Sequence, residues 1–310
     1  MKRRDFFKSA AVVGLASIFK PDAFGSVNSS SALAVQASPD MVAVMGGEPE
    51  AMLIRAMKEL GGIGKYVKRG QKVVIKPNIG WDRKPELAAN TNPQLVAGLV
   101  KLCKAAGASE VIVFDHSCQD WRKCYENSGI ERAVIAAGGK MVPANDESYY
   151  REVDLPRGVN MKKAKIHKAL LDCDVWFNVP VLKHHGGAKT TISMKNLMGI
   201  VWDRGYFHSH DLHQCIADAA TFHKQPALNI VDAYRIMKSN GPQGKSETDV
   251  VKLKSLIVSH DFVAADTAAM KLYSQVQPTD MKDVRYIALA EKLKVGTQNI
   301  EKLNVKRIKM

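Results

Sequence analysis

The chain has 310 residues, of which 46% are apolar and 25% are charged, and its formal net charge is +14. This composition is ordinary for a globular protein, and beyond the first twenty residues no segment is long and apolar enough to cross a membrane. The positive charge suits an anionic ligand, acidic lipid headgroups or an acidic protein partner, as well as a surface of solvated lysines. No recognition-helix or base-stacking motif is present, which argues against nucleic acid.

The first segment has the features of an export signal. The stretch RRDFFK precedes an apolar run over 10–19, which is shorter than the ~20 residues needed to span a bilayer. The arginine pair resembles a twin-arginine signal, which exports folded proteins to the periplasm. Small residues favour cleavage after Ala37, with Ala34 as a second site. Residues 1–37 are then the signal peptide and 38–310 the mature, periplasmic chain. An uncleaved N-terminal anchor is the alternative.

Predicted strands and helices alternate along the rest of the chain. The first strand, 72–78, is followed by a helix over 92–107 that ends at Gly107. The further strands are 109–117, 173–182, 226–234 and 253–261, and the further helices are 129–139, 212–224, 262–274 and 283–294. Continuous apolar strands separated by helices predict an α/β fold: a single large domain with a mostly parallel sheet and helices on both faces. The polar stretch 143–165 is interpreted as an excursion from the sheet.

Polar or ionisable side chains follow every predicted strand. Ligands of such sheets bind at the carboxyl ends of the strands, so these residues predict one shared cleft. We expect Asp232 to ligate a metal or to orient a lysine or histidine, and Asp261 to cap a helix. The residues at the strand ends are Lys76, Asn78, Trp81, Asp115, His116, Ser117, Lys183, His184, His185, Asp232, His260 and Asp261.

The stretch VLKHHGGAKTTISMKNLMG, residues 181–199, predicts an anion-binding loop. Its paired glycines allow the backbone to approach a ligand closely, and Lys183, Lys189 and Lys195 supply positive charge. His184 or His185 would face the same cleft. The spacing of a nucleotide-binding phosphate loop is absent. A surface loop with solvated lysines is the alternative interpretation.

The stretch GYFHSHDLHQCIADA, residues 205–219, places His208, His210 and His213 at an H-x-H-x-x-H spacing. This spacing suits zinc or another divalent metal. Asp211 is predicted to cap a helix with His213 in its first turn, where the helix dipole favours a neutral imidazole. Two further interpretations stay open. At least one histidine could act in acid–base chemistry, or the three could simply form local hydrogen bonds.

Several segments together resemble a bacterial and archaeal family known as domain of unknown function 362. They include VVIKPNIG, VPVLKHHGGAKTTISMKNLMGIV, IVDAYRIMKSNGPQG and LIVSHDFVAADTAAM, in that order, and the likeness spans roughly residues 70–300. The resemblance implies a cofactor- or anion-binding role for Lys76, Asn78, Lys195 and Asn196. It also favours His185 over His184, and the pair His208 and His210 over His213. The matching positions are Lys76, Asn78, Lys183, His185, Lys195, Asn196, Gly199, His208 or His210, Asp232, Gly241, Pro242 and Gly244.

The five cysteines have no C-x-x-C spacing, so the iron–sulfur clusters carried by some members of the family are not expected here. A disulfide between Cys118 and Cys124 stays open. Cys103 and Cys173 lie in apolar patterns and are interpreted as buried.

We therefore expect an enzyme that acts on a small anionic substrate, with His185, His210, Lys183 and Asp232 as catalytic residues. His208, His210 and His213 would hold a divalent metal if one is used. The alternative is a non-catalytic accessory protein that carries a metal or cofactor to a periplasmic redox partner. The export route and the basic surface favour that alternative.

Overall fold

The computed structural model describes residues 38–310. The predicted export signal and both predicted cleavage sites lie outside these residues. In the described part, no helix is long and apolar enough to cross a membrane. The first described residues lead directly into a strand of the main sheet, β1 (Met41–Met45).

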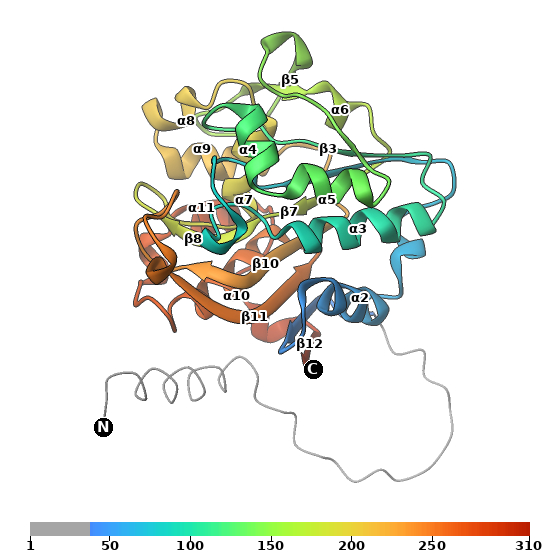
Figure 1. Ribbon diagram of the computed structural model, residues 1–310. Helices are drawn as coiled ribbons and strands as arrows, with labels where there is room; N and C mark the ends of the chain where they lie inside the picture. The colour runs from blue at the N-terminus through green and yellow to red at the C-terminus, as the bar shows by residue number, and fades with distance from the viewer. Residues whose placement is uncertain (1–37) are drawn as a thin grey trace, which may run out of the picture.

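A ten-stranded sheet forms the centre of the molecule, as Figure 1 shows. Its main path runs β12-β1-β11-β10-β7-β2-β3-β4, and β8 and β9 extend from β10. Most neighbouring pairs are parallel, which confirms the predicted α/β class. The other strands are β2 (Lys72–Pro77), β3 (Glu110–Val113), β4 (Lys140–Met141), β7 (Val175–Val179), β8 (Val181–His185), β9 (Lys189–Thr191), β10 (Leu228–Met237), β11 (Val250–Ser259) and β12 (Val305–Lys309).

Helices cover both faces of the sheet, as predicted. Side chains alternate along each strand, so that Val42 and Val44 of β1 pack on one face and Met41 and Ala43 on the other. One face carries α2 (Pro49–Glu59), α3 (Pro93–Ala105), α4 (Trp121–Asn127) and α5 (Ile130–Ala136). The other carries α7 (Ser193–Asn196), α9 (Leu212–Ala219), α10 (Phe262–Tyr273) and α11 (Tyr286–Lys292).

Three strand pairs depart from the predicted parallel arrangement. β11 runs antiparallel to both β10 and β1, and β8 runs antiparallel to β9. The connection between β10 and β11 contains only a single turn of helix, at Glu247–Asp249. A parallel crossover usually contains an α-helix that covers the sheet, and without one the chain returns as an antiparallel strand. The buried carboxylate of Asp249 shapes this return by accepting hydrogen bonds from Lys245 N, Ser239 Oγ and Asn240 Nδ2.

The predicted strand over 173–182 is two strands, β7 and β8. Pro180 separates them, because proline has no N–H to donate to a sheet ladder. Three elements near the ends of the described chain, β1, α2 and β12, escaped the sequence prediction. β12 lies in a lysine-rich segment and pairs in parallel with β1.

The polar stretch 143–165 leaves the main sheet, as predicted. It contributes β5 (Tyr150–Asp154) and part of β6 (Lys163–His167), which pair with each other as a separate two-stranded sheet. In Figure 1 this hairpin stands at the opposite end of the molecule from β12. The short helix α6 (Lys168–Leu171) follows it, and α8 (Gly205–Ser209) precedes α9.

Candidate functional site

A cavity of about 370 Å³ lies where β2, β3 and β8 end, and α7 and α8 close it. We call it the lysine cavity, because Lys76, Lys183 and Lys195 all line it. Seven of the residues predicted to be catalytic, metal-ligating or cofactor-binding meet here, namely Lys76, Asn78, Lys183, His185, Lys195, Asn196 and His208. The polar residues at several strand ends thus share one cavity. Ligands of α/β sheets usually bind at this edge, where the strands end.

Lys76 forms a buried ion pair at the base of the cavity. Its Nζ lies 2.9 Å from Asp115 Oδ1 and donates to Asn196 Oδ1 at 2.7 Å. Both side chains of the ion pair are almost completely buried. Burial lowers the pKa of Lys76, and the negative charge of Asp115 opposes that shift. Asp115 Oδ2 accepts from Ile79 N at 2.6 Å, so the carboxylate is held from two sides.

Asparagine side chains connect the lysines. Asn196 Oδ1 also accepts from Asn78 Nδ2 at 3.0 Å, and Asn78 Oδ1 accepts from Lys183 Nζ at 3.0 Å. Lys183 Nζ donates in addition to the backbone carbonyl of Ala89. Burial, together with the nearby charge of Lys195, lowers the pKa of Lys183 to about 7. The amine can therefore gain or lose a proton near neutral pH.

Lys195 has the fewest partners of the three lysines. It is 9% exposed, and among the described residues its ammonium has one hydrogen-bond contact, with Met198 Sδ at 2.9 Å. A thioether is a weak acceptor, so the buried charge lacks a counter-charge of its own. Burial, together with the charges of Lys76 and Arg204, lowers the pKa of Lys195 to about 8. Holding a charged ammonium here costs stability unless an anion arrives.

Gly199 allows the backbone to approach the ion pair closely. A Cβ at this position would lie 1.8 Å from Asp115 Oδ1 and 2.6 Å from Lys76 Nζ. Its carbonyl also accepts from His116 N at 3.1 Å, which joins the segment after α7 to the end of β3. The K-N-x-x-G stretch therefore needs a glycine at its end, because any side chain there would overlap the ion pair.

His185 lines the lysine cavity from the end of β8. Its Nδ1 accepts from Ala188 N at 3.0 Å, so the proton of the neutral ring is on Nε2. Burial and the charges of Lys195 and Lys183 lower the pKa of His185 to about 2. The ring therefore stays neutral and has its Nε2–H available as a donor. His184 does not line the cavity, and its Nδ1 accepts from Gly241 N.

The three histidines predicted to share a metal do not converge. His208 has an exposed side chain that lines the lysine cavity. His210 stacks on Tyr206 at 3.8 Å between ring centroids, and His213 Nδ1 accepts from Tyr286 N. Across residues 38–310, no group of three or more His, Cys, Asp or Glu side chains is placed to hold a metal ion. The three-histidine grouping is therefore wrong.

Local structure explains this separation. His208 lies in α8 rather than in the predicted loop, and His210 ends that helix. Asp211 caps α9 as predicted, accepting from His213 N and Gln214 N. The cap sets the direction of α9, which buries His213 against α11 instead of exposing it to the cavity. His210 is likewise away from the cavity, so its predicted catalytic role is not supported by position.

Asp232 also lies away from the lysine cavity. Its buried carboxylate accepts from Asn92 N at 2.7 Å and from Tyr234 N at 3.0 Å. Burial raises the pKa of Asp232 to about 6, against the effect of these two hydrogen bonds. Asp232 joins β10 to the start of α3, and the structure does not bring it together with the predicted site residues that line the cavity.

Arg204 is a charged cavity residue that the sequence did not predict. Its Nη1 donates to His116 O at 2.8 Å and lies 3.0 Å from Cys118 Sγ, and its Nη2 donates to Ser117 O at 2.9 Å. No motif marks it, because it follows a stretch without regular structure. Cys118 lines the cavity as a free, exposed thiol and Cys124 is buried and free, so the disulfide left open is not formed.

The pattern described as Domain of unknown function (DUF362) matches residues 73–271. The chain belongs to this family. The matched region begins in β2 and ends in α10, so it contains the three buried lysines and Gly199. All the residues that line the lysine cavity therefore lie within the matched region of this DUF362 chain.

A curated relative is Thylakoid-associated protein sll1697 from Synechocystis sp.. It is 27% identical over 229 residues, which cover 70% of this chain and 68% of the relative. A solved structure of a Thermotoga maritima protein aligns with 79% of this chain at 12% identity and a TM-score of 0.45. The DUF362 chain spans 60% of the length of that protein.

Proposed function

We propose that the lysine cavity binds a small anion, such as a phosphate or carboxylate group, and performs acid–base chemistry on the molecule that carries it. The observation that carries the proposal is Lys195, a buried ammonium that lines the cavity and whose one hydrogen-bond contact within residues 38–310 is with a thioether. A bound oxyanion would supply the missing counter-charge and a strong acceptor.

The charge of the cavity wall supports an anion rather than a cation. Among its described lining residues there are three lysines and Arg204, against the single carboxylate of Asp115. That carboxylate is already paired with Lys76. The remaining positive charge is partly shielded from water, where it attracts an anion more strongly than a surface lysine would.

Lys183 and His185 have different chemical capacities. A neutral Lys183 donates its two hydrogens to Asn78 Oδ1 and Ala89 O and keeps a lone pair, so it could accept a proton from a bound substrate. His185 can only donate from Nε2, since Nδ1 is occupied by Ala188 N. The proposal therefore makes Lys183 the acid–base group, and His185 a hydrogen-bond donor to the substrate.

Anion binding is tested by calorimetric titration of inorganic phosphate and oxalate into the full chain. The Lys195→Met variant keeps the length of the side chain but removes its charge, and we expect it to weaken binding about 10- to 100-fold, the value of one charge-assisted hydrogen bond. Lys58→Met is the matched control, because Lys58 is an exposed lysine of α2 outside the cavity. Unchanged affinity in Lys195→Met, or no binding of either anion, would contradict the proposal.

Catalysis is tested separately, by turnover of a panel of phosphate monoesters and small carboxylates. We expect Lys183→Met to lower kcat by roughly 10²- to 10⁴-fold, the usual contribution of an acid–base group. The wild-type rate should also change with pH near 7, where Lys183 titrates. Anion binding without turnover of any member of the panel would support a non-catalytic binding protein instead.

A further inference from the structure

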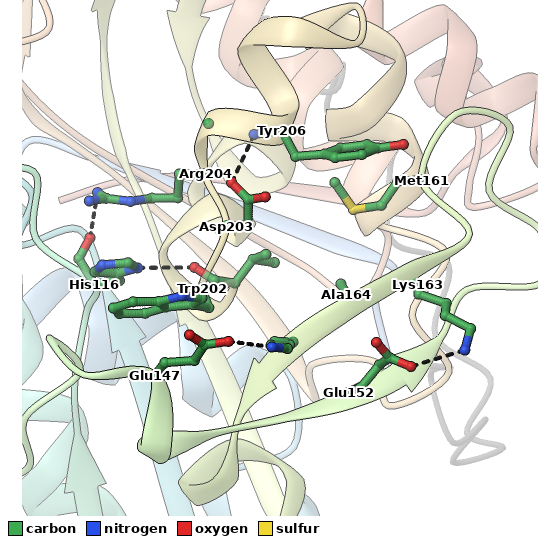
Figure 2. Close-up of a pocket in the computed structure, with 13 residues that line it drawn as sticks. His116, Glu147, Glu152, Met161, Lys163, Ala164, Trp202, Asp203, Arg204 and Tyr206 are labelled. Carbon is green, nitrogen blue, oxygen red and sulfur yellow. Dashed lines mark hydrogen bonds and ion pairs between the residues drawn. The ribbon is translucent and has the colours of Figure 1, made fainter.

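A second cavity, of about 600 Å³, adjoins the lysine cavity. Three residues line both, namely His116, Arg204 and Gly205. We call the second one the aromatic chamber, because Trp202 and Tyr206 lie on its wall beside Met161. Figure 2 shows the chamber between the segment 201–206 and the β5–β6 hairpin, with Arg204 on the side of His116.

The charged groups of the chamber already have partners. Glu152 pairs with Lys163 at 2.9 Å, and Glu147 pairs with Lys165. Asp203 Oδ1 accepts from Tyr206 N at 3.0 Å. These pairs are exposed and lie on the hairpin side, as Figure 2 shows. The chamber therefore has no buried, unpaired charge comparable with Lys195, and it suits the uncharged part of a ligand.

Trp202 is held in place by neighbouring rings before any ligand binds. His116 stacks on it with ring centroids 5.1 Å apart and an interplanar angle of 1°, and Tyr150 contacts it at 5.4 Å. His116 is fixed in turn, because its Nδ1 bonds to Val201 O at 3.1 Å. Figure 2 shows the His116 and Trp202 rings lying parallel. A flat group that packs on Trp202 would therefore cost little side-chain entropy.

Arg204 forms the boundary between the two cavities. Its three polar contacts, to His116 O, Ser117 O and Cys118 Sγ, hold the guanidinium against the loop after β3. Gly205 follows it and also lines both cavities, and within 4 Å of a Cβ added there only Asp203 Oδ1 would lie, at 3.3 Å. The boundary thus combines a fixed cation with a residue that has no side chain.

We propose that both cavities bind one ligand, an organic anion with a compact anionic head and a planar aromatic tail. The head occupies the lysine cavity, and the tail packs beside Trp202 in the aromatic chamber. The combined volume lies in the range that binds molecules of this size. This inference rests on the proposed function, since it takes the lysine cavity as the site of the anion.

The experiment compares inorganic phosphate with 1-naphthyl phosphate by calorimetric titration of the full chain. We expect 1-naphthyl phosphate to bind wild type about tenfold more tightly, the gain of an aromatic contact and its buried area. Trp202→Ala should remove this advantage and leave phosphate affinity unchanged. Trp121→Ala is the matched control, since Trp121 lies in α4 outside both cavities.

A second variant keeps the test valid if Trp202→Ala fails to fold. Tyr206→Ala removes the other ring of the chamber wall, which does not line the lysine cavity, and we expect it to weaken binding of 1-naphthyl phosphate about three- to tenfold while phosphate binds as in wild type. Equal affinity of wild type for the two anions would overturn the inference and leave the lysine cavity intact. Binding of 1-naphthyl phosphate that survives Lys195→Met would overturn both this inference and the proposed function.

Discussion

Gly199 passes so close to the Lys76–Asp115 ion pair that any side chain there must displace it. The added Cβ of Gly199→Ala would lie 1.8 Å from Asp115 Oδ1. We expect the variant to lose about 3 kcal/mol of unfolding free energy, the scale of disrupting a buried ion pair. Chemical denaturation followed by circular dichroism measures this loss.

Gly186→Ala is the control for this experiment. Gly186 lies in the turn between β8 and β9 and is exposed, and nothing lies within 4 Å of a Cβ added there. We expect its unfolding free energy to stay within about 0.5 kcal/mol of wild type. If both glycine variants were equally stable, the close approach at Gly199 would not be a structural requirement.

At the scale of elements, α10 positions the helix that carries Lys195 and Asn196. Asp266 of α10 accepts from Ser193 N at 2.8 Å and from Met194 N at 3.1 Å, the first two residues of α7. Burial raises the pKa of Asp266 to about 7. The carboxylate caps a helix of only four residues, which could not hold its direction alone.

Asp266→Asn should therefore affect both stability and binding. The asparagine presents an N–H₂ group to one of the two backbone N–H groups, which then has no acceptor. We expect the free energy of unfolding to fall by about 1–3 kcal/mol. Phosphate should also bind more weakly, because α7 carries Lys195. Asp120→Asn is the control, since Asp120 is an exposed residue that caps α4 by accepting from Lys123 N, and asparagine caps equally well. Phosphate affinity equal to wild type in Asp266→Asn would show that α7 needs no such support.

At the scale of the whole molecule, the buried lysines make stability depend on pH. Burial lowers the pKa of Lys183 to about 7 and that of Lys195 to about 8, while both stay near 10.5 in the unfolded chain. Above pH 7 the unfolded chain therefore binds more protons than the folded one. Without anions, the unfolding free energy should rise between pH 7.5 and 9.

The rise should be no more than about 1.4 kcal/mol per pH unit for each lysine. Denaturation at several pH values in a buffer without phosphate measures it. Lys195→Met should show a smaller slope than wild type, whereas Lys58→Met should show the same slope. Saturating phosphate should reduce the slope as well, because an anion stabilises the charged lysines. A stability that falls over this range in the wild type would contradict the assignment.

Sequence patterns predicted most of the fold because they depend on local burial. Apolar strands alternating with amphipathic helices predicted the sheet and its two covered faces. The same patterns failed for the direction of β11, which follows a connection without a covering α-helix. They also failed for the short elements β1 and β12, which pair with strands far away in the sequence.

For the site, the sequence by itself determined which lysines and asparagines follow the strands, since the carboxyl ends of parallel strands share an edge. Only the tertiary structure decided which groups meet there. It separated His208, His210 and His213, because the cap at Asp211 turns α9 into the core. It also brought in Arg204 and the support from Asp266. Charge balance and burial depend on contacts between distant segments, and no local pattern encodes them.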